Sequence, residues 1–226
     1  MQEEELRVAV FAPHPDDDII GCGGAMRLHA LAGHRVTVVY LTSGGAGSLS
    51  CRGDELAARR EAEATAAAGR LGAEKQVFLR CPDGGLQDDT ALLTRLVALL
   101  RELRPHVVYL PHAGDEPRDH RATHALVSEA VRRAAGPWFA ECGDQPWRVQ
   151  TVLGYEVWTP LPRAGFVLDI SAVMADKLEA LRMHVSQVSG VAYHQAVAGL
   201  NRYRGGMTGR GEYCECFEVV LASRLW

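Results

Sequence analysis

Short apolar runs alternate with helical patterns through the first 134 residues of this 226-residue chain, and this alternation constrains the fold more than any other feature. The strand-like runs span residues 7–12, 36–41, 76–79 and 107–110, and the helical patterns that follow them span residues 19–32, 55–71, 90–103 and 120–134. Parallel strands need a crossover connection, which is usually a helix. The alternation therefore predicts βαβ units and an α/β fold with a mainly parallel sheet.

The rhythm changes after Gly136-Pro137. Strand-like runs follow at residues 152–158, 166–170 and 215–222, with helical patterns at residues 171–184 and 191–203. We expect the glycine-rich stretches 42–53 and 205–209 to be mobile loops. A hydrophobic content of 47% is enough for one substantial core, so we expect a single domain over residues 1–226.

An imidazole and adjacent carboxylates directly follow the first strand-like run, in the segment His14-Pro15-Asp16-Asp17-Asp18. Ligands gather at the carboxyl ends of strands in an α/β sheet. An Asp-rich N-cap for the next helix is the alternative interpretation, but capping needs one carboxylate and accounts for neither His14 nor the second aspartate. The segment therefore indicates metal ligands with a spare base beside them.

A second polar segment, residues 111–124, follows the strand-like run 107–110 and contains Asp119-His120. Two strand ends can converge on one ion when their strands are neighbours in the sheet. His14, Asp17 and His120 then form a set of two histidines and one carboxylate that leaves a position open for water, as catalytic zinc requires.

These motifs resemble those of the LmbE/PIG-L family of zinc-dependent N-acetylglucosaminyl deacetylases. The resemblance rests on Ala12-Pro13-His14-Pro15-Asp16-Asp17, Gly21-Cys22-Gly23-Gly24 and Asp119-His120, and continues more weakly through Arg60, Pro82-Asp83-Gly84, residues 155–158, 177–187 and 213–217. It implies a Rossmann-like three-layer fold and one zinc ion per chain on His14, Asp17 and His120. The implied enzyme is a metal-dependent amidohydrolase that removes an acetyl group from an N-acetylglucosamine-type conjugate.

The same resemblance implies roles for four further residues. Asp16 corresponds to the general base that activates water, and Asp119 to a carboxylate that orients an imidazole. Arg60 and Asp83 correspond to residues that meet sugar hydroxyls, for which a forked donor and a carboxylate acceptor are suited. The alternatives are a helix cap for Asp16 and a solvated helix charge for Arg60.

Pro117 departs from the family pattern. Many members have His-x-Asp-His here, with the first histidine assigned as acid or oxyanion stabiliser, whereas this chain has Pro117-Arg118-Asp119-His120. Proline can donate neither a proton nor a hydrogen bond, so that function is missing or transferred. The histidines available to replace it are His112, His124 and His184.

Charge and composition narrow the choice of partners. The formal net charge is −4, and no basic stripe or polybasic cluster indicates nucleic acid or a lipid surface. The acidic start of the chain is no signal segment, and no run reaches the roughly 18 apolar residues of a membrane span. We therefore expect a cytoplasmic protein with a small-molecule partner, an N-acetylated amino-sugar conjugate. The resemblance does not identify the aglycone, which is the group attached to the amino sugar. It implies that the chain can form a homo-oligomer, a trimer or a hexamer.

Two other groups of residues could be misread as cofactor sites. The cysteines Cys214 and Cys216 sit in an alternating, strand-like stretch, and the six cysteines are expected to be reduced thiols. Gly21-Cys22-Gly23-Gly24 lacks the Gly-x-Gly-x-x-Gly spacing of a dinucleotide site, so we expect these glycines to let a helix approach the sheet closely.

Two alternative functions stay open. One is a metal-binding homologue of the same fold whose deacetylase activity has decayed, for which Pro117 is the best argument. The other is a different metallohydrolase, such as a phosphoesterase with a two-metal site that includes Asp16, Asp17 and Asp18. Two-metal sites need ligands from several strand ends, and only two ligand-bearing loops are recognisable in the sequence.

Overall fold

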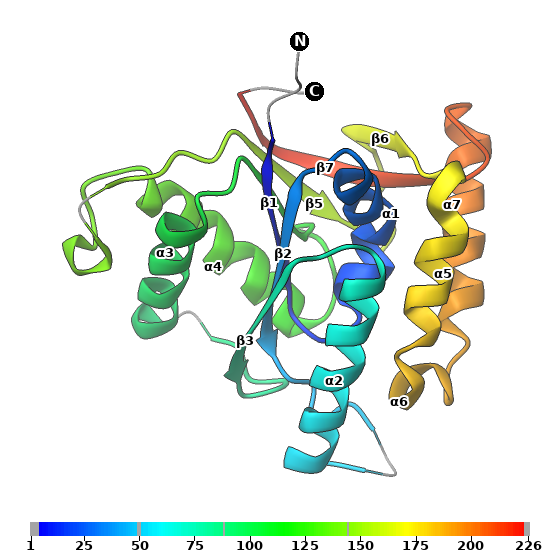
Figure 1. The fold of residues 1–226 in the computed structure, drawn as a ribbon, viewed down its shortest axis with the longest axis horizontal. Helices are drawn as coiled ribbons and strands as arrows, with labels where there is room; N and C mark the ends of the chain where they lie inside the picture. The colour runs from blue at the N-terminus through cyan, green and yellow to red at the C-terminus, as the bar shows by residue number, and fades with distance from the viewer. Residues whose placement is uncertain (1–4, 49–50, 88, 144, 224–226) are drawn as a thin grey trace.

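A seven-stranded sheet forms the centre of the protein in a computed structural model, which describes residues 5–48, 51–87, 89–143 and 145–223 (Figure 1). The strand order is β3-β2-β1-β4-β5-β7-β6. The strands are β1 (Arg7–Ala12), β2 (Arg35–Thr42), β3 (Lys75–Cys81), β4 (Val107–Pro111), β5 (Thr151–Tyr155), β6 (Phe166–Asp169) and β7 (Cys214–Ala222). The first five pair in parallel, and β7 runs antiparallel to both β5 and β6. The predicted α/β class with a mainly parallel sheet is confirmed.

Helices cover both faces of the sheet, which gives three layers (Figure 1). The helices are α1 (Asp17–Leu31), α2 (Asp54–Arg70), α3 (Thr90–Leu103), α4 (Arg118–Ala134), α5 (Met174–Arg182), α6 (Val185–Val188) and α7 (Tyr193–Thr208), with 3-10 turns at Ala140–Cys142 and Ser171–Val173. Alternate residues of β1 face opposite layers, because side chains along a strand point to opposite faces. Val8 and Val10 pack towards α1, α2 and α5, whereas Ala9 and Phe11 pack towards α3 and α4.

The chain departs from the predicted elements in its second half. The stretch 205–209 was expected to be a loop, but α7 continues to Thr208. The reason is a close backbone approach, since a Cβ on Gly205 would lie 2.4 Å from the carbonyl oxygen of Glu212. The helix expected over residues 171–184 is broken into a 3-10 turn and α5, which ends at Arg182. Part of the other expected loop, residues 49–50, lies outside the described residues.

Helix α1 carries the first polar segment and is fixed to the sheet by its glycines. A Cβ on Gly21 would lie 2.1 Å from the ring of Tyr155, so the predicted close approach is confirmed. The helix is kinked at Cys22, whose φ is −143°. Glu215 accepts hydrogen bonds from the backbone N–H groups of Gly24 and Ala25, each at 2.8 Å. A carboxylate there satisfies donors that the kink frees.

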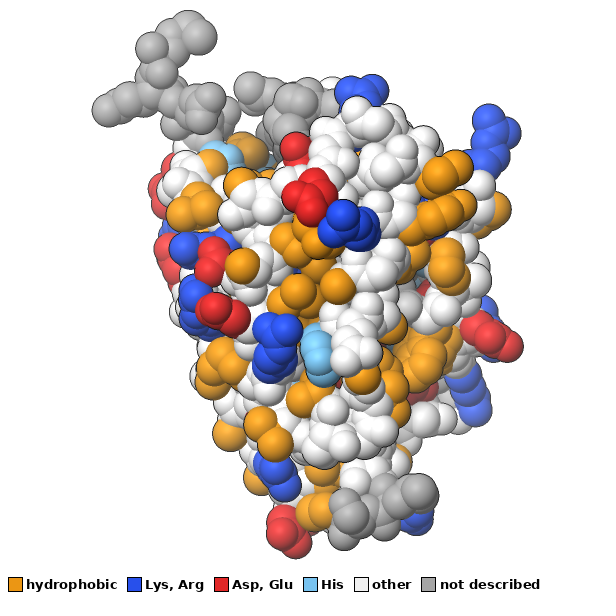
Figure 2. Space-filling model, turned by 90° about the vertical axis from the view of Figure 1, so that its right-hand side faces the viewer, with side chains coloured by type: hydrophobic (Ala, Val, Ile, Leu, Met, Phe, Trp, Pro, Cys, Tyr) orange, Lys and Arg blue, Asp and Glu red, His pale blue; other side chains and the backbone are white. Residues whose placement is uncertain are grey.

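The buried Lys177 balances the charge of Glu215. Its Nζ lies 2.7 Å from Glu215 Oε1 and donates to Asn201 Oδ1 at 3.0 Å. The Lys177 side chain is fully buried and the Glu215 side chain is 1% exposed. Through Glu215, this ion pair joins α5 and β7 to the middle of α1, just after the kink at Cys22. The same part of the chain, α5 and α7, forms the face shown in Figure 2, where acidic and basic side chains are interspersed.

Candidate metal and catalytic site

The two polar segments meet at the carboxyl ends of two neighbouring strands. β1 ends at Ala12, just before His14, and β4 ends at Pro111, ahead of the segment that leads into α4. The two strands pair directly in the sheet. The topology therefore brings the N-termini of α1 and α4 together at one edge.

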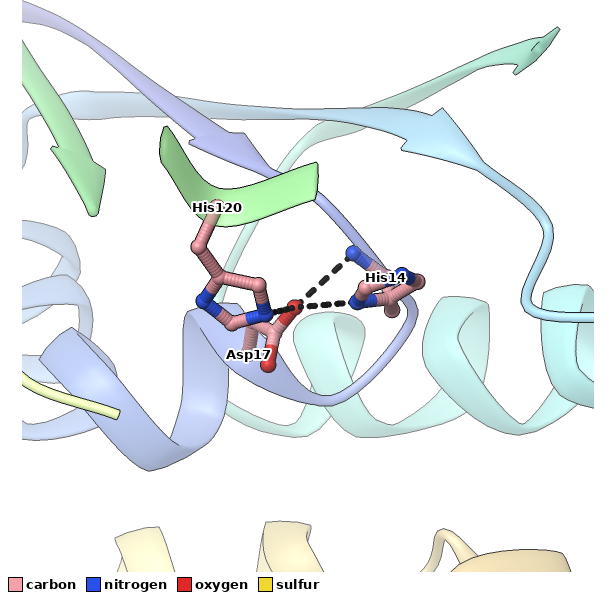
Figure 3. A group of neighbouring side chains, drawn as sticks. All are labelled: His14, Asp17 and His120. Atoms are coloured by element: carbon pink, nitrogen blue, oxygen red, sulfur yellow. Dashed lines mark hydrogen bonds and ion pairs between the residues drawn. The ribbon is translucent and has the colours of Figure 1, made fainter. Parts of the chain in front are cut away.

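His14, Asp17 and His120 converge there (Figure 3). Asp17 Oδ2 lies 3.1 Å from His14 Nδ1 and 3.3 Å from His120 Nε2. The backbone N–H of His14 donates to the same oxygen at 2.9 Å, which fixes the carboxylate. Asp17 and His120 are buried, and the His14 side chain is 20% exposed. The cluster is thus open to solvent on the side of His14.

The remaining nitrogen of each imidazole faces a carboxylate. His120 Nδ1 is 2.8 Å from Asp115 Oδ2, and both side chains are fully buried. His14 Nε2 lies 3.1 Å from Asp83 Oδ1 and 3.2 Å from Asp119 Oδ2. With a cation bound between the three side chains, these acceptors would keep the ring protons on the outer nitrogens and leave the lone pairs of the inner nitrogens to the cation. Metal-binding histidines are oriented in this way in proteins.

The donor set fits a divalent cation. His120 Nε2 is buried and has no hydrogen-bond partner within the described ranges, which is costly for a neutral imidazole nitrogen without a ligand. Two imidazole nitrogens and one carboxylate oxygen are ligands that zinc takes. A second possible group, His14 with Asp83 and Asp119, is less suited to a cation. Asp119 already accepts from the backbone N–H groups of Gly84 at 2.7 Å and Leu86 at 3.1 Å.

The charges around His14 and Asp17 shift their pKa values in opposite directions. Burial acts to lower the pKa of His14, but hydrogen bonds to Asp119, Asp17 and Asp83 outweigh it and raise the pKa well above its usual value. Burial acts to raise the pKa of Asp17, but His120 and His14 lower it to about 2. Asp17 therefore stays a carboxylate at neutral pH, as a ligand must.

Asp16 adopts a strained backbone conformation beside the cluster. Its φ is 133°, in a region that non-glycine residues rarely adopt. Burial raises its pKa to about 7, and the guanidinium of Arg60, 3.2 Å from Asp16 Oδ1, opposes that rise. Asp16 is the residue that precedes α1, but its side chain makes no capping hydrogen bond. The helix-cap alternative therefore finds no support in the geometry.

Arg60 lies beneath the site and not on its open side. The side chain is buried, and its guanidinium donates to the carbonyl oxygens of Pro15 at 2.7 Å and Gly44 at 3.1 Å. A solvated helix charge is thus wrong as an interpretation of Arg60. The guanidinium holds Asp16 and its neighbouring backbone, whereas its contact with a sugar hydroxyl stays a prediction. Asp83 lies at the rim, where its Oδ2 accepts from the N–H of Ala46 at 2.7 Å.

Sequence reasoning gave no role to Asp115. Its Oδ2 faces His120, and its Oδ1 accepts from the N–H groups of Trp158 at 3.0 Å and Thr159 at 2.7 Å. Its only signal in the sequence is its place in the polar segment, five residues before His120. The strand expected over residues 152–158 ends at Tyr155, because the chain turns there to meet this carboxylate.

The histidines that could replace a donor at Pro117 differ in their surroundings. Both ring nitrogens of His112 are engaged, by the carbonyl oxygen of Thr159 at 2.7 Å and the N–H of Gly114 at 3.1 Å. His124 Nδ1 lies 2.9 Å from the carbonyl oxygen of Pro111. His184 is fully buried, and neither of its ring nitrogens has a hydrogen-bond partner in the described part of the chain.

The sequence and structure are similar to those of known proteins. The sequence profile of the family "PIG-L: GlcNAc-PI de-N-acetylase" matches residues 9–131. A 1D-myo-inositol 2-acetamido-2-deoxy-alpha-D-glucopyranoside deacetylase of Rhodococcus erythropolis is 31% identical over 76% of this chain and 67% of its own length. A diacetylchitobiose deacetylase of Thermococcus kodakarensis is 34% identical over 80% of this chain and 70% of its own length.

Solved structures match over nearly the whole chain. The conserved protein TT1542 from Thermus thermophilus superposes with a TM-score of 0.87 at 33% identity, over 98% of this chain and 97% of its own. The N,N'-diacetylchitobiose deacetylase from Pyrococcus horikoshii gives a TM-score of 0.84 at 28% identity, over 94% and 83%. The 4-carboxy-2-hydroxymuconate hydratase GalB from Pseudomonas putida also gives a TM-score of 0.84, at 26% identity over 97% of both chains.

Among the described residues, no helix has the length and apolar character needed to cross a membrane.

Proposed function

The chain belongs to the PIG-L family, and from this premise we propose that it is a zinc-dependent N-deacetylase acting on an N-acetylglucosamine-type conjugate. The observation that carries the proposal is the convergence of His14 Nδ1 and His120 Nε2 on Asp17 Oδ2, with an outer carboxylate behind each imidazole. The relatives named as deacetylases support the reaction, and the donor chemistry of the site supports zinc.

In this proposal His14, Asp17 and His120 hold one zinc ion per chain. When bound, zinc acts as a Lewis acid on a carbonyl and lowers the pKa of a water molecule towards 7. Asp115 and Asp119 keep the outer ring nitrogens protonated and so keep the inner lone pairs available. Asp119 is thereby a positioning residue for His14, and Asp115 is the corresponding residue for His120.

Asp16 is the general base of the proposal. Amide hydrolysis requires that a water oxygen attack the acetyl carbonyl carbon, that the water lose a proton, and that the departing amine gain one when the C–N bond breaks. Asp16 is adjacent to Asp17, and its carboxylate accepts no capping hydrogen bond that would occupy it. A base near its pKa at the working pH is the most effective one. Arg60 holds the Asp16 carboxylate in place at 3.2 Å.

Asp83 and Arg60 are the proposed sugar-binding residues. Asp83 lies at the open side, between His14 and the N–H of Ala46, where a carboxylate can accept from a hydroxyl. Arg60 is buried beneath Gly44, so it reaches a sugar only where the loop that contains Gly44 is displaced. Its main effect on the reaction is through Asp16.

A single domain, a cytoplasmic location and a trimer or hexamer remain predictions.

One observation favours a second candidate, a homologue with weakened deacetylase activity. Pro117 immediately precedes α4, where its carbonyl oxygen accepts from the N–H of His120 at 3.1 Å, and it supplies no donor. The hydratase among the structural neighbours shows that this fold supports other chemistry as well. The phosphoesterase alternative finds less support, because the two possible ligand groups share His14 and the Asp119 carboxylate is already engaged.

An amine-release assay with zinc added and withheld tests the proposal. The substrates are N-acetylglucosamine, N,N'-diacetylchitobiose and N-acetylglucosaminyl-inositol. We expect zinc-dependent amine release from at least one of them, and none from a His14→Ala, His120→Ala double variant that keeps its circular dichroism spectrum. Metal content of the double variant, measured by elemental analysis, separates loss of ligands from loss of turnover. Unchanged metal content in the folded double variant would contradict the ligand assignment.

A further inference from the structure

The chain between β5 and β6 begins with a turn, residues 156–161, that one carboxylate closes. Glu156 Oε1 accepts from the backbone N–H of Leu161 at 2.6 Å. The Glu156 side chain is 4% exposed, and Leu161 is buried. The 156–161 turn therefore has a fixed shape, although it contains neither helix nor strand.

Arg204, on α7, fastens both ends of the 156–161 turn. Its guanidinium pairs with the Glu156 carboxylate and also donates to the carbonyl oxygen of Leu161 at 2.7 Å. The Arg204 side chain is 13% exposed, so water competes little for these contacts. Hydrogen bonds between charged groups are stronger than neutral ones, and removal of one partner of a buried ion pair leaves an uncompensated charge. The guanidinium thus ties the turn to a helix that is remote in sequence.

The 156–161 turn in turn holds the polar segment that precedes α4. The backbone N–H groups of Trp158 and Thr159 donate to Asp115 Oδ1 at 3.0 and 2.7 Å. The hydroxyl of Thr159 accepts from the N–H of Glu116 at 3.0 Å, and its carbonyl oxygen lies 2.7 Å from His112 Nε2. Asp115 is therefore held directly and through residues on both sides of it.

Asp115 transmits this position to His120. Its Oδ2 lies 2.8 Å from His120 Nδ1, and both side chains are fully buried. A displaced Asp115 carboxylate would rotate the imidazole or lose its hydrogen bond. Functional sites require their side chains to be held within roughly 0.5 Å of the productive geometry.

We propose that Arg204 and Glu156 are positioning residues for the candidate metal ligand His120, which they reach through the 156–161 turn and Asp115. Neither belongs to the candidate ligand groups. This inference rests on the proposed function, because it requires that His120 bind the cation. If the ion pair only stabilised the fold, its loss would lower the free energy of unfolding and leave the affinity for zinc unchanged.

The zinc affinity of Arg204→Gln, measured by competition with a chelator, tests the proposal. We expect the affinity to fall about tenfold, the lower limit for residues that orient a metal-binding histidine. Arg204→Lys should recover part of the loss, because an ammonium group can still donate to Glu156 and to the Leu161 carbonyl oxygen. If Arg204→Gln does not fold, Glu156→Gln replaces it. An amide oxygen can still close the turn, and the same fall in affinity is expected from the lost ion pair.

Two arginine variants are the controls. Arg202→Gln lies on the same helix and breaks an exposed ion pair with Glu212. Arg101→Gln removes a buried guanidinium that fastens a different loop, by donating to the carbonyl oxygens of Trp138 and Phe139. Arg101→Gln therefore matches the loss of stability without a contact to the 156–161 turn. Both controls should bind zinc as the parent does, and a tenfold loss in Arg101→Gln would overturn the proposal.

A double-mutant cycle with Asp115→Ala tests the route of the effect. Asp115→Ala removes the link between the 156–161 turn and His120. In that background Arg204→Gln should change the zinc affinity by less than about twofold, because residues that act through one contact are not additive. Equal losses with and without Asp115 would overturn the proposal, as would parent affinity in a folded Arg204→Gln variant.

Amide hydrogen exchange in the metal-free protein reports on the turn itself. The N–H groups of Trp158 and Thr159 should exchange about tenfold faster in Arg204→Gln, as expected when a charge-assisted hydrogen bond no longer opposes local opening. Unchanged exchange at both positions would overturn the proposed route.

Metal binding and turnover together separate this inference from the proposed function. If the parent binds zinc and Arg204→Gln weakens that binding as expected, but no substrate releases amine, the inference stands and the deacetylase proposal fails. If amine is released and Arg204→Gln binds zinc as tightly as the parent, the deacetylase stands and the inference is wrong. A parent that binds no zinc would overturn both.

Discussion

The carboxylate of Asp115 lies 2.8 Å from Nδ1 of His120, and both side chains are fully buried. The other carboxylate oxygen of Asp115 accepts from the backbone N–H groups of Trp158 and Thr159. The loop after β5 thus fixes the orientation of Asp115, and Asp115 fixes the tautomer of His120. Through this chain of contacts, backbone in a distant part of the sequence determines which nitrogen of His120 faces Asp17.

Replacement of Asp115 by asparagine should reverse that tautomer. The single amide oxygen of Asn would be taken by Trp158 and Thr159, so the NH₂ group would face His120 and force its Nδ1 to accept. The ring proton then moves to Nε2, where it blocks a ligand lone pair. We expect zinc affinity to fall by about 10–100-fold in Asp115→Asn, as for other residues that orient a metal-binding histidine. Competition with a chelator measures the affinity, and Glu116→Gln, at the exposed neighbouring position, is the control. Unchanged affinity in a folded Asp115→Asn variant would show that the hydrogen bond does not set the tautomer.

Asp16→Asn separates metal binding from proton transfer. The substitution keeps the shape of the side chain and removes the base, so metal content should match that of the parent. The rate of amine release should fall by about 10²–10⁴-fold, which is the usual contribution of a general base. The measurement is kcat on the best substrate from the amine-release panel, with zinc saturating. Turnover at the parent rate would assign the general base to another residue.

The sequence was sufficient to predict the ligand-bearing ends of β1 and β4. One strand is followed at once by His14 and Asp17, and a second strand is followed by His120. These three candidate ligands lie at one sheet edge whenever the two strands are neighbours. The structure brings the three together as expected from this pattern. The role of Gly21 was also predictable from the sequence. A glycine in a helix pattern indicates close packing, and Gly21 packs against Tyr155 where a Cβ would not fit.

Contacts between distant segments could not be read from the sequence. Asp115 is held against His120 by the backbone N–H of Trp158, and Glu215 holds α1 through the backbone N–H of Ala25. The positions of these N–H groups depend on the completed fold. A register irregularity near Arg80, in the pairing of β2 with β3, is equally hidden, because a left-handed arginine leaves no pattern in composition or periodicity. The predicted end of α7 is too early, because Gly205 and Gly206 are typical of a turn. In the structure Gly205 stays helical and allows a close backbone contact.

Lys177→Met tests the buried ion pair that anchors α1. Without Lys177 Nζ, the buried Glu215 carboxylate keeps its hydrogen bonds from Gly24 and Ala25 but loses its counter-charge. We expect the free energy of unfolding, measured with urea, to fall by about 3–5 kcal/mol. Lys75→Met is the matched control, because it breaks an exposed pair with Glu102 and should cost about 0–1 kcal/mol. A Lys177→Met, Glu215→Gln double variant should recover part of the loss. Equal effects of Lys177→Met and Lys75→Met would contradict a structural role for the buried pair.

We expect the free energy of unfolding to fall as the pH falls, because the buried His29 resists protonation in the folded protein. Burial, with a smaller effect of His34, lowers the pKa of His29 from 6.5 to about 4 in the folded protein. Between pH 6.5 and 4 the unfolded chain binds a proton that the folded chain does not, so the free energy of unfolding falls by up to about 1.4 kcal/mol per pH unit. His29→Gln keeps a hydrogen-bonding group for Tyr109 and removes the titration. Its free energy of unfolding, followed by denaturant titration at each pH, should depend less on pH over this window. Burial also lowers the pKa of His184, to about 3. His184 therefore adds a pH dependence of the same sign to the free energy of unfolding, and this part remains in the His29→Gln variant. Parallel curves for parent and variant would contradict the assignment.

Many family members have a histidine at the position of Pro117, and another residue of this chain can supply the hydrogen bond that this histidine donates to the oxyanion. His184 is the first candidate for that replacement. Pro117 offers no donor, whereas His184 is fully buried with neither ring nitrogen hydrogen-bonded within the described residues. Its pKa is lowered by burial and by Arg60, which places it beside the residues that hold Asp16. We expect His184 to have taken over the hydrogen bond to the oxyanion, with His124 as the weaker alternative because its Nδ1 is engaged by Pro111.

The comparison requires kcat/KM for four single variants, at Pro117, His124 and His184, on one accepted substrate. If His184 has replaced the donor, His184→Ala should lower kcat/KM by about 10²–10³-fold, the effect of removing one oxyanion donor. Pro117→His should then change little, since the interaction is already made. His184→Gln should restore part of the rate, because an amide N–H can still donate, and a purely structural role would not produce that recovery. A large gain in Pro117→His, together with indifference to His124→Ala and His184→Ala, would instead identify a weakened enzyme in which the donor was lost without replacement.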